Sequence, residues 1–197
     1  MTTPAPVRRL SASAARLAAA FACAACMIGA PAIAQQVTME TLLDRINIED
    51  FLTRYYYDLA NGNAHELSEY FTEDALLDVD GTIARGHDEI DALYGRRPGE
   101  EPAAGPRPIR YPLGQMLLNN PVIEINGNTA QAHVIWTGVM NPGVGEAPTL
   151  YEQGREDTEL VKVDGKWLIS RRYISSDSGL PDRFDATWEP RGNPLEE

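Results

Sequence analysis

Apolar residues between positions 38 and 61 recur at intervals of three and four, which is the spacing of one face of a helix. These residues are Leu42, Leu43, Ile46, Phe51, Leu52, Tyr55, Tyr56 and Leu59. Asn47 and Asp50 have the spacing of a helix start, so a break in this helix is expected near residue 47. Gly62 is expected to end the helix.

Two shorter helices are expected to follow. Asn63 and Glu66 have the spacing of a capping pair and would open a helix that runs through Phe71. Residues 87–95, HDEIDALYG, predict another helix that ends at its glycine. Between these helices, residues 75–81 alternate in the manner of a strand or hairpin.

Long alternating runs in the second half of the chain predict strands. Asn126-Gly127 and Asp164-Gly165 each separate two such runs, and the first pair is typical of a type I′ hairpin turn. The runs cover residues 115–125, 128–140, 149–163 and 166–174. Helices followed by a meander of strands predict an α+β fold, with the helices packed on one face of a curved antiparallel sheet.

Two segments do not fit helices or strands. Residues 95–109, GRRPGEEPAAGPRPI, are rich in proline and glycine and predict a loop. A loop of this length favours a lid over a simple connection. Residues 177–197 are expected to form an irregular acidic tail.

The first 34 residues differ from the rest. Three arginines precede an apolar run of small residues, and Ala32-Ile33-Ala34 fits a cleavage site. We therefore predict a signal peptide over 1–34 and a periplasmic or secreted protein. The alternatives are an uncleaved membrane anchor, for which the apolar run is short, and a lipoprotein attached through Cys26.

Charge and cysteine content limit the kinds of partner and metal site that this chain can have. Both cysteines, Cys23 and Cys26, lie in the leader, so the mature chain has no thiol, disulfide or cysteine-based metal site. Without the three leader arginines, 14 of the 17 basic residues remain against 29 acidic ones, which gives a net charge of −15. Phosphates would be repelled, so no nucleic acid is expected as a partner. The three isolated histidines predict no metal site.

The order of these elements resembles the SnoaL-like branch of the NTF2-like superfamily, over a domain of residues 36–176. The stretches that carry the resemblance are RYYYDLANGNAHELSEYFTEDALLDVDG, NPVIEINGNTAQAH and GREDTELVKVDGKWLISRR. The resemblance implies a cone-shaped pocket between helices and sheet, no cofactor, and a homodimer. Members include ketosteroid isomerase, scytalone dehydratase and polyketide cyclases, while other members only bind or assemble.

Residue by residue, the family pattern matches only in part. The phenol that stabilises an oxyanion in ketosteroid isomerase corresponds to Tyr55, but the aspartate base corresponds to Val79. Asp78 and Asp80 flank that position, and on a regular strand they would face away from the pocket. This disfavours steroid-type isomerisation.

The aspartate and histidine of the dehydratases correspond to Ala60 and Gln115, neither of which titrates. Asp58 does not replace the aspartate, because two residues along a helix turn the side chain by about 200°. A second histidine of scytalone dehydratase corresponds to His133.

The site expected from this comparison has Tyr55 as proton donor and His133 as base. Substrate-binding residues are expected on the later strands and at the end of the loop: Gln115, Tyr111, Trp136, Tyr151, Arg155 and Arg171. Arg171 is placed in the pocket because strand alternation puts it on one face with Trp167 and Ile169. The simpler alternatives are that Tyr55 only packs in the core and that His133 faces away from it.

Two functions follow from these expectations. The first is a cofactor-independent lyase or isomerase, with dehydratase-like acid–base chemistry on a small hydrophobic hydroxylated substrate, aromatic or polycyclic. The second is a non-catalytic periplasmic module that binds a ligand or assembles as a dimer, with the family's Asp–His pair lost. Convergence of Tyr55 and His133 on one cavity would favour the enzyme.

Overall fold

The computed structural model describes residues 37–60, 64–95 and 112–188, all within one compact unit. The first part contains α2 (Met39–Ala60), the 3₁₀ helix η2 (Ala64–Tyr70), β1 (Phe71–Val79), β2 (Thr82–Arg85) and α3 (Gly86–Leu93). The second part contains β3 (Leu113–Asn126), β4 (Thr129–Asn141), β5 (Thr149–Val163), β6 (Lys166–Ser178) and the 3₁₀ helix η3 (Asp182–Phe184).

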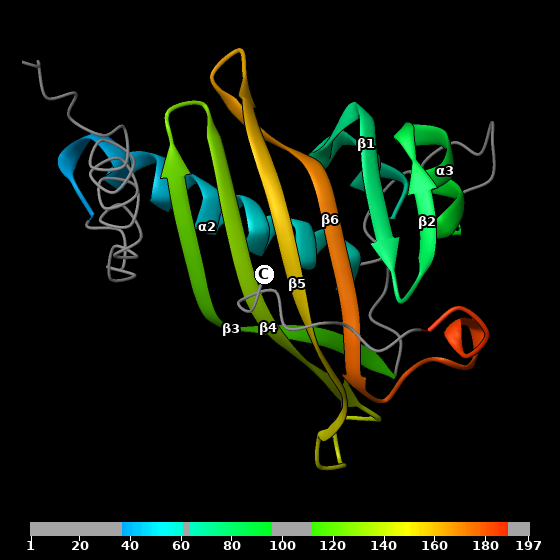
Figure 1. The fold of residues 1–197 in the computed structure, drawn as a ribbon. Coiled ribbons are helices and arrows are strands. Elements are labelled where there is room, and N and C mark those ends of the chain that lie inside the picture. The colour runs from blue at the N-terminus through cyan, green and yellow to red at the C-terminus, as the bar shows by residue number, and fades with distance from the viewer. Residues whose placement is uncertain (1–36, 61–63, 96–111, 189–197) are drawn as a thin grey trace, which may run out of the picture. The chain divides into compact units, whose positions relative to one another are not determined.

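The six strands form a single sheet in the order β2-β1-β6-β5-β4-β3. Helix α2 crosses one face of the sheet behind β3 to β6, and α3 lies beside β1 and β2 (Figure 1). This arrangement confirms the α+β class, with helices on a curved sheet. The sheet is mixed rather than antiparallel throughout, because β1 pairs in parallel with the last strand, β6.

Bulges bend the sheet. Between Asn119 and Val122, β3 carries one more residue than its partner β4. Asn120 has a φ of 49°, and Pro121 follows it, so the regular pleat is interrupted at this point. The two halves of β3 consequently run in different directions (Figure 1). This curvature opens space between the sheet and α2.

Helix α2 runs without interruption from Met39 to Ala60, so the expected break near residue 47 is wrong. Ile48 and Leu52 lie one turn apart and are both buried against the sheet. Asp50 accepts a hydrogen bond from Arg54 at 2.7 Å within the helix instead of capping a new one. Burial of Ile48 and Leu52 against the sheet outweighs the local capping signal.

The two hairpin turns differ. Asn126 pairs with Thr129, so the loop residues are Gly127 and Asn128, and only Gly127 has a positive φ. The type I′ turn predicted at this place is therefore wrong, because that turn needs positive φ at both positions. Asp164-Gly165, with φ values of 49° and 80°, meets that requirement.

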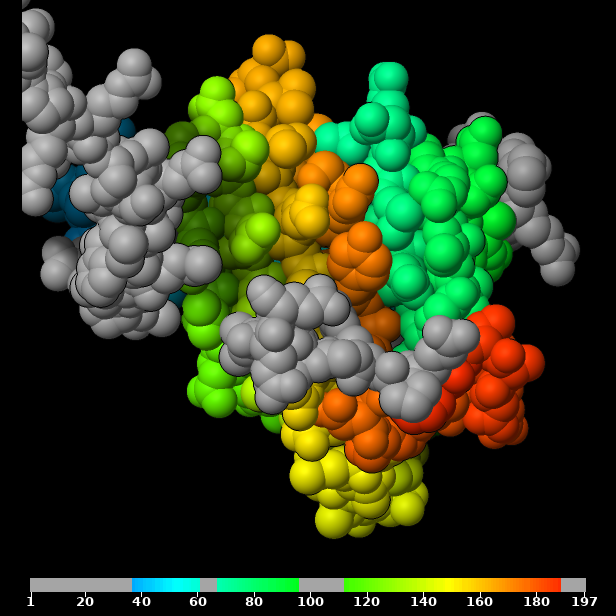
Figure 2. All heavy atoms as spheres, in the orientation of Figure 1, coloured from blue at the N-terminus to red at the C-terminus, as the bar shows by residue number. Residues whose placement is uncertain are grey.

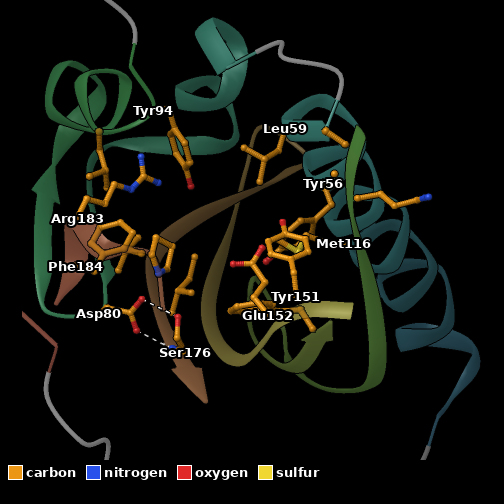
Figure 3. A pocket seen from close by; sticks show the side chains of 18 of the residues that line it. Tyr56, Leu59, Asp80, Tyr94, Met116, Tyr151, Glu152, Ser176, Arg183 and Phe184 are labelled. Carbon is orange, nitrogen blue, oxygen red and sulfur yellow. Dashed lines mark hydrogen bonds between the residues drawn. The ribbon is translucent and has the colours of Figure 1, made fainter. Parts of the chain in front are cut away.

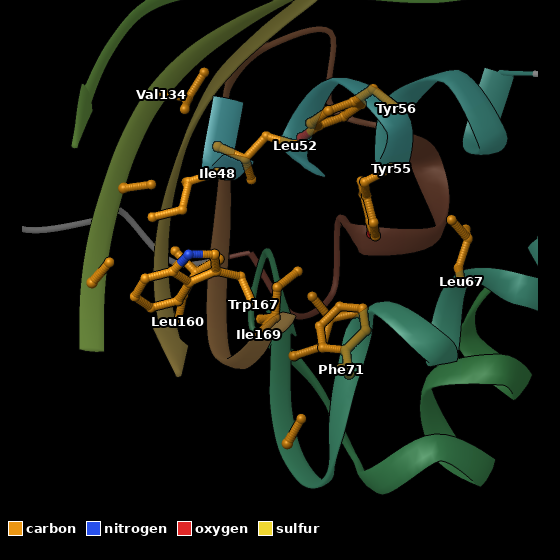
Figure 4. Close-up of a cluster of buried hydrophobic side chains, with 14 of the residues drawn as sticks. Ile48, Leu52, Tyr55, Tyr56, Leu67, Phe71, Val134, Leu160, Trp167 and Ile169 are labelled. Atoms are coloured by element: carbon orange, nitrogen blue, oxygen red, sulfur yellow. The ribbon is translucent and has the colours of Figure 1, made fainter. Parts of the chain in front are cut away.

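The core fills the space between α2, η2, β1 and the inner face of the sheet (Figure 4). Its largest fully buried apolar members are Tyr55, Phe71, Ile48, Leu52, Leu67, Leu77, Ile90, Ile123, Leu160 and Ile169. A charged residue, Arg172, is equally buried among them.

Several expectations lie outside the described residues: the signal peptide over 1–34, nearly all of the loop over 95–109, Tyr111, and the tail beyond residue 188. The described part of the tail is more ordered than expected, because β6 continues to Ser178 and η3 follows. None of the helices in the described ranges is long and apolar enough to span a membrane.

Candidate functional site

A cavity of about 400 Å³ lies between the second half of α2, the turn after β1, the ends of β3 to β6 and η3. Its lining is mostly aromatic and aliphatic, with a few ionisable groups. Figure 3 shows lining side chains on two walls: Asp80, Tyr94, Arg183 and Phe184 on one, and Tyr56, Met116, Tyr151 and Glu152 on the other.

Glu152 and Tyr151 are neighbours in β5, yet both line the cavity. In a regular strand they would face opposite sides of the sheet. Gly138 of β4 pairs with Glu152 and Val139 pairs with Leu150, so Tyr151 is the extra residue of a bulge. The bulge turns the Tyr151 side chain to the cavity side.

Asp80 also reaches the cavity, from the turn between β1 and β2. Its φ of 50° takes it out of the strand alternation, so the expectation that it faces away from the pocket is wrong. The Ser176 backbone N–H donates to Asp80 Oδ1 at 2.7 Å, and Ser176 Oγ donates to Asp80 Oδ2 at 2.9 Å. The carboxylate is therefore fixed at the cavity wall.

Behind the cavity wall lies a buried polar network. The Tyr56 hydroxyl donates to Glu156 Oε2, and Arg172 Nη2 donates to Glu156 Oε1 at 2.9 Å. Arg172 Nε donates to Thr158 Oγ1 at 3.1 Å. The Arg172 guanidinium also lies 4.2 Å from the centre of the Tyr55 ring, a cation–π contact. Glu156 and Arg172 are fully buried, so water cannot solvate their charges. Each charge is instead compensated by the opposite charge of its partner.

The Tyr55 and Tyr94 hydroxyls hydrogen-bond to each other, and both residues line the cavity. One hydrogen bond between two hydroxyls uses one proton, so the other proton remains available to a ligand. Burial raises the pKa of both phenols, although the charge of Arg172 lowers each somewhat. Both are therefore neutral hydrogen-bond donors at physiological pH.

Burial also raises the pKa of the Glu152 carboxyl. The neighbouring Asp80 raises it further, whereas a hydrogen bond from Tyr151 and the charge of Arg183 lower it. Raised carboxyl pKa values in a cleft are typical of groups that exchange protons with a substrate. Within the described residues, no group of three or more His, Cys, Asp or Glu side chains could hold a metal ion.

The residues expected at the site divide into two sets. Tyr55, Gln115, Trp136 and Tyr151 line the cavity. His133 does not, because Ala132, Val134 and Trp136 form the buried face of β4 and leave His133 on the other. His133 Nδ1 pairs there with Asp157, and both side chains are 28% exposed. Tyr55 and His133 thus do not converge on one cavity.

Arg155 and Arg171 are likewise on the outer face of the sheet. Arg155 Nε forms an exposed ion pair with Asp177 at 3.0 Å. Arg171 is exposed because Ser170 is an extra residue in β6, opposite the step from Glu159 to Leu160. The bulge reverses the alternation after Ile169 and turns Arg172 inward in place of Arg171.

Among the cavity residues that were not predicted as members of the site are the ionisable residues Asp80, Tyr94, Glu152 and Arg183. For Glu152 a signal exists, because alternation from the apolar Leu160 places residues 158, 156, 154 and 152 on the buried face. That interpretation places two glutamates, Glu152 and Glu156, on the inner face of the sheet. Burial of Glu156 there is favourable only because Arg172 lies beside it. Tyr94 and Arg183 carry no comparable signal in the sequence.

The sequence profile of the SnoaL-like domain family matches residues 40–173, which is more than half of the chain. The chain belongs to the SnoaL-like domain family. A comparison with curated proteins found no match.

Solved structures similar to this SnoaL-like protein share its fold at low sequence identity. An NTF2-like protein with a cystatin-like fold from Novosphingobium aromaticivorans is 20% identical, with a TM-score of 0.56 over 77% of this chain and 92% of that one. A candidate scytalone dehydratase from the same organism is 19% identical, with a TM-score of 0.55 over 69% and 85%. ActVI-ORFA from Streptomyces coelicolor is 15% identical, with a TM-score of 0.56 over 68% and 96%.

Proposed function

We propose that the cavity binds a small, largely apolar, hydroxylated substrate and catalyses a cofactor-independent lyase or isomerase reaction by proton transfer. The observation that carries this proposal is the Glu152 carboxyl, whose pKa is raised by burial and which faces an aromatic cavity. Tyr55, Tyr56, Tyr94, Trp136 and Phe184 suit flat, aromatic or polycyclic ligands.

Glu152 takes the part of the base in this proposal, because His133 lies on the other face of the sheet. The carboxylate removes a proton from a carbon of the substrate. In a dehydration, the electron pair of that bond forms a double bond, and the hydroxyl on the next carbon leaves as water with a proton from Tyr94. The proton taken up by Glu152 then passes to the Tyr94 oxygen, which restores both groups. In an isomerisation, the proton returns to a different carbon.

The tyrosines have separate tasks. Tyr94 is the donor, and Tyr55 holds its hydroxyl in place through their mutual hydrogen bond. The Tyr56 hydroxyl donates its hydrogen bond to Glu156, so its oxygen can accept a hydrogen bond from a substrate hydroxyl. Membership in the SnoaL-like family and the fold shared with a candidate scytalone dehydratase support a dehydratase-type reaction as part of the proposal.

The test is turnover of phenolic dimers, steroids and polyketides by the purified protein, with products identified by mass spectrometry and NMR. Glu152→Gln should reduce turnover by roughly 10²- to 10⁴-fold while the substrate still binds. Glu159→Gln is the matched control, because Glu159 is exposed on the opposite face of the same strand. Equal turnover in Glu152→Gln and wild type would refute this role. Binding without any turnover in the wild type would favour a ligand-binding module.

A further inference from the structure

The family profile ends at residue 173, but residues after this position also line the cavity. Residues 179–188, here called the C-terminal segment, contribute Pro181, Arg183 and Phe184 to its lining. Part of the site is thus built by a segment outside the matched domain. A residue placed there can adapt a common cavity to a particular substrate.

The C-terminal segment is fixed to the body of the protein. Phe184 is only 4% exposed, and the Trp188 indole N–H donates to the Ser176 carbonyl at 3.4 Å. The hydroxyls of Thr187 and Thr82 hydrogen-bond at 3.1 Å, which ties the segment to β2. Figure 2 shows the red segment packed against the green surface of the β1–β2 region. Arg183 is therefore held at the cavity by an ordered segment.

Gly81 permits this close packing. Its φ is 86°, and a side chain on it would collide with the carbonyl oxygen of Thr187. Gly81 follows Asp80 directly, so one turn both aims a carboxylate at the cavity and receives the C-terminal segment.

The charge of Arg183 is available to a ligand. Its guanidinium lies 4.7 Å from the centre of the Phe184 ring, and it forms no ion pair with any residue in the described ranges. Arg172, which lies behind the cavity wall, does not share this property, because it is buried and paired with Glu156. An arginine keeps its charge at any physiological pH and can donate two parallel hydrogen bonds to an oxygen anion.

Arg183 and Glu152 lie on opposite walls of the cavity (Figure 3). The two groups interact electrostatically. Burial raises the pKa of Glu152, and the positive charge of Arg183 lowers it. Asp80, on the same wall as Arg183, has its oxygens occupied by Ser176. A ligand between the walls would meet the Glu152 carboxylate on one side and the Arg183 guanidinium on the other.

We infer that Arg183 is a specificity-determining residue that binds the substrate oxygen on which negative charge develops, and that the substrate is a carbonyl or phenolic compound. This inference rests on the proposed function. When Glu152 removes a proton from carbon, the electron pair of that bond moves toward the conjugated carbonyl and leaves an enolate oxygen. The guanidinium of Arg183 then stabilises that oxygen, and the proton stays on Glu152 until it is returned.

The experiment uses para-nitrophenol as a probe, since its ionised form resembles an enolate and has a visible absorption of its own. Para-nitroanisole, which cannot ionise, is the neutral counterpart. The absorption of the bound probe is followed against pH in the full-length protein, in Arg183→Gln and in Arg183→Lys. Arg155→Gln is the matched control, because Arg155 lies on the outer face of the sheet.

Wild type should bind para-nitrophenol as the phenolate, with the apparent pKa of the bound probe below that of the free probe. Arg183→Gln should weaken phenolate binding roughly 10- to 100-fold and remove that shift, with binding of para-nitroanisole unchanged. Arg183→Lys should restore part of the shift, and Arg155→Gln should match wild type. Failure of the wild type to bind the phenolate, or an undiminished shift in Arg183→Gln, would overturn the inference. The titration involves no turnover, so its outcome is separate from that of Glu152→Gln.

Discussion

Gly138 of β4 lies directly opposite Glu152 of β5, and the glutamate side chain occupies the space that a side chain on Gly138 would need. A methyl group built on Gly138 would collide with Cγ of Glu152 and approach its Oε1 to 2.8 Å. The position of the proposed base therefore depends on the absence of a side chain on the neighbouring strand. Gly138 leaves the space beside its strand open, and the Glu152 side chain occupies that space.

Gly138→Ala is expected to move the Glu152 carboxyl and reduce turnover by roughly 10- to 100-fold, because small displacements of reacting groups have effects of this size. Stability should change less, since the methyl group would meet the side chains of Glu152 and Tyr151 rather than backbone. Gly114→Ala is the control, as its methyl group would meet the Tyr151 hydroxyl at an ordinary 3.6 Å. Steady-state kinetics and urea denaturation measure the two effects. Equal turnover in both variants would contradict the dependence of Glu152 on Gly138.

The pH profile should report Glu152. A base must be ionised, so kcat/KM should fall as the pH drops through the pKa of this carboxyl. Burial raises that pKa, so the acid limb should lie above the ~4.3 of an ordinary glutamate. Asp80 raises the pKa and Arg183 lowers it. Asp80→Asn should therefore move the limb to lower pH, and Arg183→Gln should move it to higher pH. A limb unmoved by either change would assign it to another group.

The same shift has a consequence for stability. Because the folded state holds the Glu152 proton more tightly than the unfolded chain does, the stability that this group contributes decreases as the pH rises through its folded-state pKa. Glu152→Gln cannot ionise and should lack this decrease. The free energy of unfolding, measured against pH for both proteins, tests the sign. A larger decrease in the variant than in wild type would contradict it.

Arg171 and Arg172 are adjacent but should differ sharply in their contribution to stability. Arg172→Met leaves the Glu156 carboxylate buried without its cation and should lower the free energy of unfolding by about 3–5 kcal/mol. Arg171→Met, on the exposed face, should change it by less than about 0.5 kcal/mol. Urea denaturation of the two variants decides between them. Similar values would contradict the register shift at Ser170.

The two tyrosines that line the cavity from α2 should also differ. Tyr56→Phe removes a hydrogen bond to an ionised carboxylate, Glu156, and should cost about 1.5–3 kcal/mol. Tyr55→Phe removes a bond to the neutral hydroxyl of Tyr94 and should cost about 0.5–1.5 kcal/mol. The difference in denaturation midpoints at equal m-values measures this order. The reverse order would show that the Glu156 network is not held by Tyr56.

Local patterns account for most of the fold. The 3.6-residue period specifies α2, and its apolar face is buried from Ile48 to Tyr56. Alternation specifies β5 over 149–163, as predicted, and Asp164-Gly165 specifies the turn after it. The helix break predicted at Asn47 is wrong because the packing of Ile48 and Leu52 against the sheet stabilises one continuous helix. This packing contributes more than a cap at Asn47 would contribute to a new helix.

The faces on which side chains lie depended on tertiary structure. A bulge at Tyr151 and another at Ser170 each shift the alternation by one residue, and a shift of one moves a side chain to the other face of the sheet. Those bulges result from pairing between strands, which no single strand encodes. Arg172, rather than Arg171, is consequently the buried partner of Glu156.

The sequence by itself determined the long helix, most strand positions and the inward faces of Tyr55 and Trp136, because these follow from the periodicity of apolar residues. Only the tertiary structure decided which charges face that cavity. Burying Glu156 becomes favourable only beside Arg172, 16 residues away, and Arg183 reaches the cavity that Glu152 lines only because the C-terminal segment returns to the sheet. Such contacts join residues that are distant along the chain, and their energies do not exist until the chain has folded.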